Sequence, residues 1–172
     1  MRILGIDPGY AIVGCGVIDY TRQRFETLEY GAITTPAGMP FGSRLAGVYH
    51  QSLQLLRQFR PEAMAVEKLY FNTNTTTAID VAQARGVILL AACEEGVPVY
   101  EYTPLQVKQA VVGYGRAEKR QVIEMTTRLL GLPRPPKPDD VADALAIAIC
   151  HAHTGPSRLE QALRTQERRT GL

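Results

Sequence analysis

The chain has 172 residues, of which 45% are hydrophobic, so it can bury the core of one domain but is too short for two large ones. It contains no apolar run of roughly 18 residues that could span a membrane, and no cleavable targeting segment before its first predicted strand, so we expect a cytoplasmic protein. Its net charge is only +2, yet residues 1–103 hold 8 basic and 10 acidic side chains, whereas residues 104–172 hold 11 basic and 7 acidic ones. The basic excess of the second part favours a polyanionic ligand, although a solvated surface would have the same composition.

The three cysteines, Cys15, Cys93 and Cys150, lie in apolar segments without C-x-x-C spacing. We interpret them as small buried hydrophobic residues, because their odd number and their spacing fit neither a zinc site nor a disulfide framework.

The first apolar run ends in a carboxylate, Asp7, and is followed by a Pro-Gly turn and a second apolar run over residues 11–18. This pattern predicts an antiparallel hairpin with Asp7 at the rim of a sheet. A carboxylate buried without a partner costs several kcal/mol or changes its pKa until it is neutral, so we expect other groups to share the site. The alternative is that Asp7 only caps the turn.

Residues 23–35 alternate like a third strand, which gives a three-strand antiparallel meander. Residues 39–60 predict a long amphipathic helix, and residues 62–67 form another short apolar strand that ends at Glu67. A right-handed crossover would place this strand parallel to the first, so that Asp7 and Glu67 meet at the same sheet edge. Glu67 could instead face solvent.

The polar loop over residues 68–77 contains two adjacent aromatics, Tyr70 and Phe71. Exposed aromatics beside an acidic site predict a surface on which bases stack, although one of the two could pack into the core. The helix predicted over residues 78–95 is apolar around much of its circumference, which is typical of a central core helix or of a dimer interface. Residues 97–102 form the last predicted strand.

Thr103 and Pro104 start the next predicted helix, as N-cap and first helical residue, and a further helix follows through Leu130. Basic side chains on these two helices and on the Gly-containing link between them form the densest basic group before the C-terminal tail. The glycines of the link would let backbone N–H groups approach a phosphate. The predicted DNA-contacting basic residues are Lys108, Arg116, Lys119 and Arg120.

The final predicted helix, residues 139–151, starts with three aspartates. Asp139 is expected to be the N-cap, whereas Asp140 and Asp143 are three residues apart and project from one face. Capping by acids at a helix N-terminus could explain all three. However, two carboxylates on one face repel each other unless cations lie between them. His151 and His153 lie too far along the helix to be ligands of these cations, although a role in orienting a water molecule stays open.

Asp7, Glu67, Asp140 and Asp143 are thus candidates for one cluster. Ligands that are all oxygen suit Mg²⁺ or Mn²⁺. Two such ions about 4 Å apart can activate a water and stabilise the leaving oxygen in phosphodiester cleavage. The cluster therefore predicts nuclease chemistry.

Five motifs, IDPG, AVEKLYF, QARGV, VKQAVVGYGRAEKRQV and DDVADALAIAICH, occur in this order between residue 1 and about residue 153. In these motifs the chain resembles the RuvC family of Holliday-junction resolvases. The resemblance implies an α/β, RNase H-like fold: a five-stranded mixed sheet, with three antiparallel and two parallel strands, and helices on both faces. We expect residues 1–154 to form this domain and residues 155–172 to form a basic tail that is disordered or loosely attached.

The resemblance also implies roles for individual residues. The four acids would be the metal-binding catalytic residues, with two Mg²⁺ or Mn²⁺ ions per site. Lys108 and Lys119 match positions that contact the backbone of the scissile strand, and Tyr70 matches an aromatic that holds the junction open, with Phe71 as the other possible register. The helix over residues 78–95 would form a homodimer interface, and a branch-migration motor of RuvA and RuvB type proteins would be a partner.

The predicted function is symmetric nicking of two like strands of a four-way DNA junction in recombination and repair, leaving 5′-phosphate and 3′-hydroxyl ends. The alternatives are a related nuclease that acts on RNA and a non-catalytic binder of branched DNA. A sugar kinase or actin relative would need a second domain of similar size, which 172 residues exclude.

Overall fold

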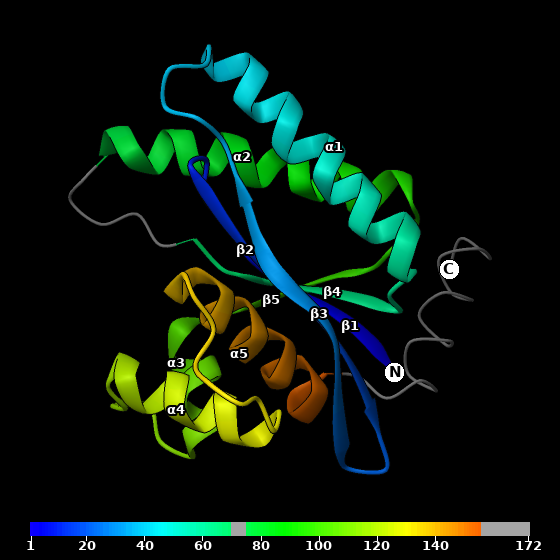
Figure 1. Cartoon of the computed structure of the whole chain (residues 1–172), viewed down its shortest axis with the longest axis vertical. Coiled ribbons are helices and arrows are strands. Elements are labelled where there is room, and N and C mark those ends of the chain that lie inside the picture. Colours follow the sequence, from blue (N-terminus) through cyan, green and yellow to red (C-terminus); the bar gives the residue numbers. More distant parts are fainter. Residues whose placement is uncertain (70–74, 156–172) are drawn as a thin grey trace, which may run out of the picture.

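The computed structural model of the chain describes residues 1–69 and 75–155, and its centre is a five-stranded mixed sheet (Figure 1). The strands are β1 (Arg2–Asp7), β2 (Ile12–Thr21), β3 (Arg24–Thr34), β4 (Ala63–Glu67) and β5 (Val99–Tyr102). They lie in the order β3-β2-β1-β4-β5. The pairs β1–β2 and β2–β3 are antiparallel, whereas β1–β4 and β4–β5 are parallel, so the predicted sheet is confirmed.

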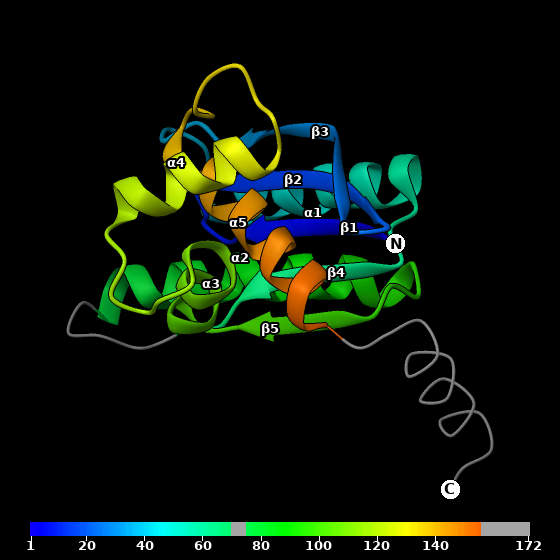
Figure 2. The same cartoon turned by 90° about the horizontal axis from the view of Figure 1, so that it is seen from below.

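Helices cover both faces of the sheet, as predicted (Figure 2). The helices α1 (Phe41–Phe59) and α2 (Thr75–Glu94) pack against each other on one face. On the other face α5 (Asp139–Thr154) lies directly on the strands, and α3 (Pro104–Val112) and α4 (Lys119–Leu129) pack against α5. The core therefore has two layers, one on each side of the sheet.

The alternation of side chains along the strands decides which layer each residue enters. Ile3 packs in the α5 layer, whereas Leu4 and Ile6 pack in the α1–α2 layer. On β4, Ala65 faces α5 and Met64 faces the other way. Because the period of a strand is two residues, the last residues of β1 and β4, Asp7 and Glu67, share the face that α5 covers.

Glycines allow α5 to lie unusually close to the sheet. A Cβ atom on Gly5 of β1 would overlap the backbone oxygen of Ala144, and one on Gly14 of β2 would overlap that of Asp140. Gly14 is also the register partner of Asp7. The contact that brings the start of α5 beside Asp7 is therefore a backbone contact, which a larger residue at position 14 would prevent.

Of the two N-cap residues predicted from the sequence, one is confirmed and one is wrong. Thr103 caps α3 in a capping box with Gln106, as predicted for this N-cap. The prediction that Asp139 caps α5 is wrong: the N-cap is Pro138, and the Asp139 carboxylate accepts a hydrogen bond of 2.7 Å from Lys137 Nζ. Its charge is thus engaged by a neighbouring lysine.

Two of the three cysteines are buried, as predicted, but the prediction is wrong for Cys93, which is exposed on α2. Tyr70, Phe71 and, except for Gly155, the predicted basic tail lie outside the described residues. Of the helices in residues 1–69 and 75–155, none has both the length and the apolar character to cross a membrane.

Candidate active site

Four carboxylates come from three elements at one edge of the sheet. Asp7 ends β1 and Glu67 ends the parallel neighbour β4, while Asp140 and Asp143 lie near the start of α5. Parallel strands present their carboxyl ends at the same edge, and α5 begins above that edge because Gly14 admits its backbone. The structure thus brings together the four acids that the sequence singled out.

The electrostatics of Asp7 show how closely the carboxyl groups lie. The pKa of Asp7 is raised from 3.8 to about 8, chiefly by burial and then by the charges of Glu67, Asp143 and Asp140, whereas the charge of Lys119 lowers it. With the effect of Lys119 included, a carboxyl with this pKa keeps its proton at neutral pH as long as no metal ion lies beside it.

Glu67 experiences the same surroundings. Burial is the largest cause that raises its pKa, followed by the charge of Asp143, while Lys119 and a hydrogen bond with Asp7 lower it. Two strand ends and one helix start therefore form a single electrostatic unit, in which the charges of acids on β4 and α5 raise the pKa of Asp7 on β1.

One ammonium group already lies among these acids. Lys119 Nζ donates a hydrogen bond of 2.8 Å to Asp143 Oδ2, and this bond raises the pKa of Lys119. Beside it is a pocket of about 280 Å³. It is lined by Glu67, Pro104, Val107, Lys108, Lys119, Val122, Asp143 and Ile147. Two of the predicted basic residues, Lys108 and Lys119, therefore face a cavity that borders the acids.

Arg116 and Arg120, two other predicted DNA-contacting residues, do not line this pocket. Arg116 and Arg120 are exposed and form no ion pair within the described part of the chain. Tyr70 and Phe71 follow β4 directly in the sequence but fall outside the described residues. The structure therefore brings two of the six, Lys108 and Lys119, to the pocket.

The donor set fits a hard divalent cation, because all four groups are carboxylates and hard cations prefer oxygen ligands. Among the described residues no three His, Cys, Asp or Glu side chains stand in an arrangement that could hold an ion as they are. The positive charge beside these acids in this structure is the Lys119 ammonium, which forms an ion pair with Asp143.

Comparisons with known proteins agree with this geometry. Residues 3–151 match the family model described as crossover junction endodeoxyribonuclease RuvC. The chain belongs to this family. A crossover junction endodeoxyribonuclease RuvC of Brevibacillus brevis is 61% identical over 152 residues, which are 88% of this chain and 92% of the relative. One of Clostridioides difficile is 56% identical over 164 residues, 95% of this chain and 96% of the relative.

A solved structure of a RuvC protein is also similar. The structure of Thermus thermophilus RuvC in complex with a Holliday junction substrate has a TM-score of 0.85 and 42% identity, and the match covers 89% of this chain and 93% of that one. This similarity confirms the predicted RNase H-like α/β fold for this member of the RuvC family.

The two histidines of α5 lie at the other end of that helix from the acids. His151 is fully buried, and its Nδ1 is 2.7 Å from the hydroxyl oxygen of Tyr102. Burial lowers the pKa of His151 to about 4, so it is neutral at physiological pH. His153 contacts the aromatic rings of Tyr20 and Phe25. These contacts explain both residues as parts of the packing of this RuvC chain.

Sequence reasoning missed Gly5 and Gly14, which position the site without contributing a functional group. The available signal was a glycine in the middle of an apolar strand, because such a glycine often marks a close approach of another backbone. The small residues of α5, such as Ala144 and Ala148, also indicate a close approach, because they lie against Gly5.

Proposed function

We propose that this chain is a metal-dependent endonuclease that resolves four-way DNA junctions by nicking two like strands symmetrically. In this proposal Asp7, Glu67, Asp140 and Asp143 are the metal-binding catalytic acids. The supporting observation is that burial, together with the charges of Glu67, Asp143 and Asp140, raises the pKa of Asp7 to about 8. Such crowding of carboxylates is costly for the free protein and is relieved by divalent cations.

The chain's own groups suit in-line hydrolysis of a phosphodiester. Asp7 and Glu67 are fixed by the ends of hydrogen-bonded strands, and Asp140 and Asp143 by a helix that is packed on the sheet, so the ligand oxygens are held by rigid elements. Two Mg²⁺ ions, or Mn²⁺ ions, would lower the pKa of the attacking water and stabilise the leaving oxygen. The products would carry 5′-phosphate and 3′-hydroxyl ends.

Basic and aromatic residues around the acids would hold the DNA. Lys108 and Lys119 line the pocket beside Glu67 and Asp143, where the backbone of the scissile strand would lie. Arg116 and Arg120 would contact phosphates further along this strand. Tyr70 and Phe71 would stack on bases at the open centre of the junction.

A homodimer would match the pseudo-two-fold symmetry of a four-way junction. On α2 the exposed positions Ile79, Gln83, Gly86 and Leu90 recur at spacings of four and three residues. The side chains of Ile79 and Leu90 are 55% and 51% exposed, which is high for large apolar residues on a helix that also has a buried face. This stripe is the proposed dimer interface, and L90R should convert the dimer to a monomer in sedimentation experiments.

The remaining parts of the proposal rest on the family. The enzyme would act in the cytoplasm, in recombination and repair, together with a branch-migration motor of RuvA and RuvB type proteins. Co-sedimentation of the junction-bound protein with such a motor is the corresponding measurement.

The decisive experiment incubates the protein with a synthetic four-way junction, with and without Mg²⁺, and maps the cleaved strands. We expect paired nicks that ligase can seal in the wild type and none in D7N. D139N is the matched control, because it also neutralises an aspartate near the start of α5, but that aspartate is bonded to Lys137. Binding without nicks would indicate a non-catalytic binder, and cleavage of RNA in preference to the junction would indicate the RNA-acting alternative.

A further inference from the structure

Arg44, in the first turn of α1, is almost completely buried, with 8% of its surface exposed. Its Nε donates a hydrogen bond of 2.8 Å to Thr35 Oγ1, and its Nη2 donates one of 3.3 Å to the backbone oxygen of Thr35. Its guanidinium carbon lies 4.7 Å from the centre of the Tyr10 ring. These contacts fix the guanidinium but do not neutralise its charge.

Among the described residues, the charge of Arg44 has no carboxylate partner. Arg2 is paired with Asp19 and Arg85 with Glu101, whereas no Asp or Glu in residues 1–69 and 75–155 forms an ion pair with Arg44. The sequence from residue 30 to residue 61, which includes all of α1, contains no acidic residue at all. A buried cation without an acid is costly, so this arrangement points to an anion that the described part of the chain does not supply.

One end of the guanidinium remains available to such an anion. Nε and Nη2 donate hydrogen bonds to Thr35. Nη1 makes no hydrogen bond to the described residues, but it is not completely shielded from solvent. Nη1 therefore reaches solvent and can donate to a ligand.

The N-terminus of α1, whose first turn includes Arg44, offers further donors. Its N-cap is Pro40, which has no side chain that could accept a hydrogen bond, and its first turn contains no acidic residue. Gly42 and Ser43 are exposed, so their backbone N–H groups can reach a ligand. The ring of Phe41 packs edge-on against that of Tyr10, with 5.9 Å between the ring centres, and Tyr10 also contacts Arg44. The guanidinium and the start of the helix thus share one neighbour.

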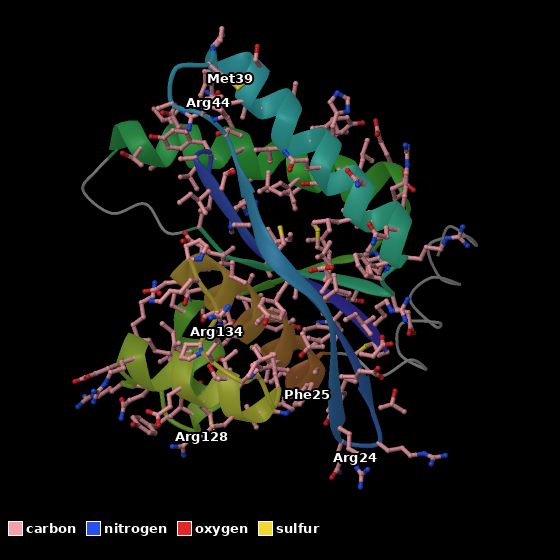
Figure 3. The ribbon with its side chains drawn as sticks, viewed as in Figure 1. Arg24, Phe25, Met39, Arg44, Arg128 and Arg134 are labelled. Atoms are coloured by element: carbon pink, nitrogen blue, oxygen red, sulfur yellow. The ribbon has the colours of Figure 1, made fainter. Side chains whose placement is uncertain are left out.

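This site is attached to the turn that follows Asp7. Tyr10 lies three residues after Asp7, and its backbone oxygen accepts a hydrogen bond of 2.5 Å from Thr35 Oγ1. The backbone N–H of Thr35 also donates to the backbone oxygen of Ala11 at 3.0 Å. Figure 3 shows Arg44 with Met39 at one end of the molecule, opposite the hairpin tip that carries Arg24. A ligand of Arg44 would therefore lie beside the catalytic turn.

We propose that Arg44 and the first turn of α1 bind a phosphate of the DNA backbone other than the one that is cleaved. This inference rests on the proposed function, because a chain of phosphates beside the catalytic turn is the anion that such a substrate brings. The oxygens of one phosphate can accept hydrogen bonds from Nη1 and from the free N–H groups. Both the planar guanidinium and the amides at a helix N-terminus favour phosphate as a ligand.

The first test measures junction binding without divalent ions over a range of salt concentrations. R44M should bind about tenfold more weakly at low salt, and the slope of log K against log salt should fall by about 0.9, the value for one duplex phosphate contact. R44K should show a smaller loss because it keeps the charge. R57M is the matched control, since Arg57 lies at the other end of α1 and is paired with Glu95. Equal slopes for R44M and R57M would overturn the proposal.

A second pair of variants keeps the test valid if R44M is destabilised. G42D places a carboxylate in the first turn of α1, where it stabilises the helix but repels a phosphate, and G47D makes the same change about one turn later. At both glycines the space that a Cβ atom would occupy is open. We expect G42D to weaken binding about tenfold and G47D to change it much less. Equal effects would contradict the site. A wild type that neither binds nor nicks the junction would instead contradict the proposed function.

Discussion

At both ends of α5 burial favours the neutral form of an ionisable group, but the neighbours of that group differ between the two ends. At its start, Asp140 and Asp143 crowd with Asp7, and the pKa of Asp7 rises to about 8. At its end, His151 is fully buried with its ring 4.6 Å from Tyr100 and in hydrogen-bond contact with Tyr102, and its pKa falls to about 4. One helix therefore carries a repulsive cluster of acids and a neutral, well-packed histidine.

This comparison distinguishes a side chain that contributes to the packing of the protein from side chains that are placed to bind a ligand. At the end of α5 the His151 ring is neutral and packs against Tyr100 and Tyr102, although its buried Nε2 has no hydrogen-bond partner among the described residues. At the start of α5 the burial of Asp7 and the charges of the neighbouring acids make Asp7 retain its proton, and within the described residues the charge of Lys119 offsets this only in part. A cost that folding leaves in place at a sheet edge is typical of a ligand site.

Removal of Asp7 should have the largest effect. We expect D7N to lower the cleavage rate of the junction at least about a thousandfold, as is usual when one member of a catalytic unit is removed, while it keeps junction binding. Single-turnover cleavage and binding assays on the same preparation measure both. Cleavage within tenfold of the wild type would remove Asp7 from the mechanism.

The same variant should change the pH dependence of stability. The pKa of Asp7 is raised by folding from 3.8 to about 8, so the folded protein binds more protons than the unfolded one between these values, and its stability falls as pH rises through this range. Without divalent ions, D7N should therefore be more stable than the wild type at pH 9 by about 1 kcal/mol or more. Urea unfolding at pH 5 and pH 9 tests this, and an equal difference at both values would contradict it.

The approach of α5 to the sheet can be broken at Gly14. A Cβ atom there would overlap the backbone oxygen of Asp140, which cannot rotate away, so G14A should lower the free energy of unfolding by about 3 kcal/mol. G47A is the control: it has open space and should raise stability by about 0.5–1 kcal/mol. If G14A is as stable as G47A, the close contact does not hold α5 in place.

The sequence predicted the sheet and the two strand-end acids because both depend on local patterns. Alternation and apolar runs identify strands, and a crossover helix makes β4 parallel to β1, so Asp7 and Glu67 had to share an edge. What could not be predicted depends on contacts between distant segments. The Lys119–Asp143 bond joins α4 to α5, and the contact of Gly14 with Asp140 joins β2 to α5.

Local propensity also misled at the start of α5. Asp139 is a favoured N-cap residue, but Pro138 takes that position and Lys137 binds the carboxylate. The preference of aspartate for N-caps amounts to about 1 kcal/mol, which a neighbouring charge and the preceding proline-rich segment can outweigh. The burial of Arg44 could not be predicted either, because nothing in the local sequence distinguishes a buried arginine from an exposed one.

The end of α5 should respond to acid. The pKa of His151 falls from 6.5 to about 4 on folding, so the unfolded protein binds more protons between these values, and the stability present above pH 6.5 is lost as pH falls toward 4. The loss should be about 2–3 kcal/mol. H151Q should reduce this dependence, and H50Q, which changes an exposed histidine of α1, should keep it. Unfolding curves between pH 4.5 and 7 that are parallel for all three proteins would contradict it.

The smallest expected effect distinguishes two lysines that are bonded to aspartates near the start of α5. Lys119 lies 2.8 Å from Asp143 and Lys137 lies 2.7 Å from Asp139, so their local contacts are alike. Only Lys119 also lowers the pKa of Asp7 and Glu67 and lines the pocket beside them. K119M should therefore weaken junction binding, lower its salt slope by about 0.9 and raise the pKa of Asp7 further, whereas K137M should leave all three unchanged. Salt-dependent binding and carboxyl titration by NMR measure these effects. Equal behaviour of the two variants would mean that the charge of Lys119 serves only its partner Asp143, and that the acids are coupled less than the raised pKa of Asp7 indicates.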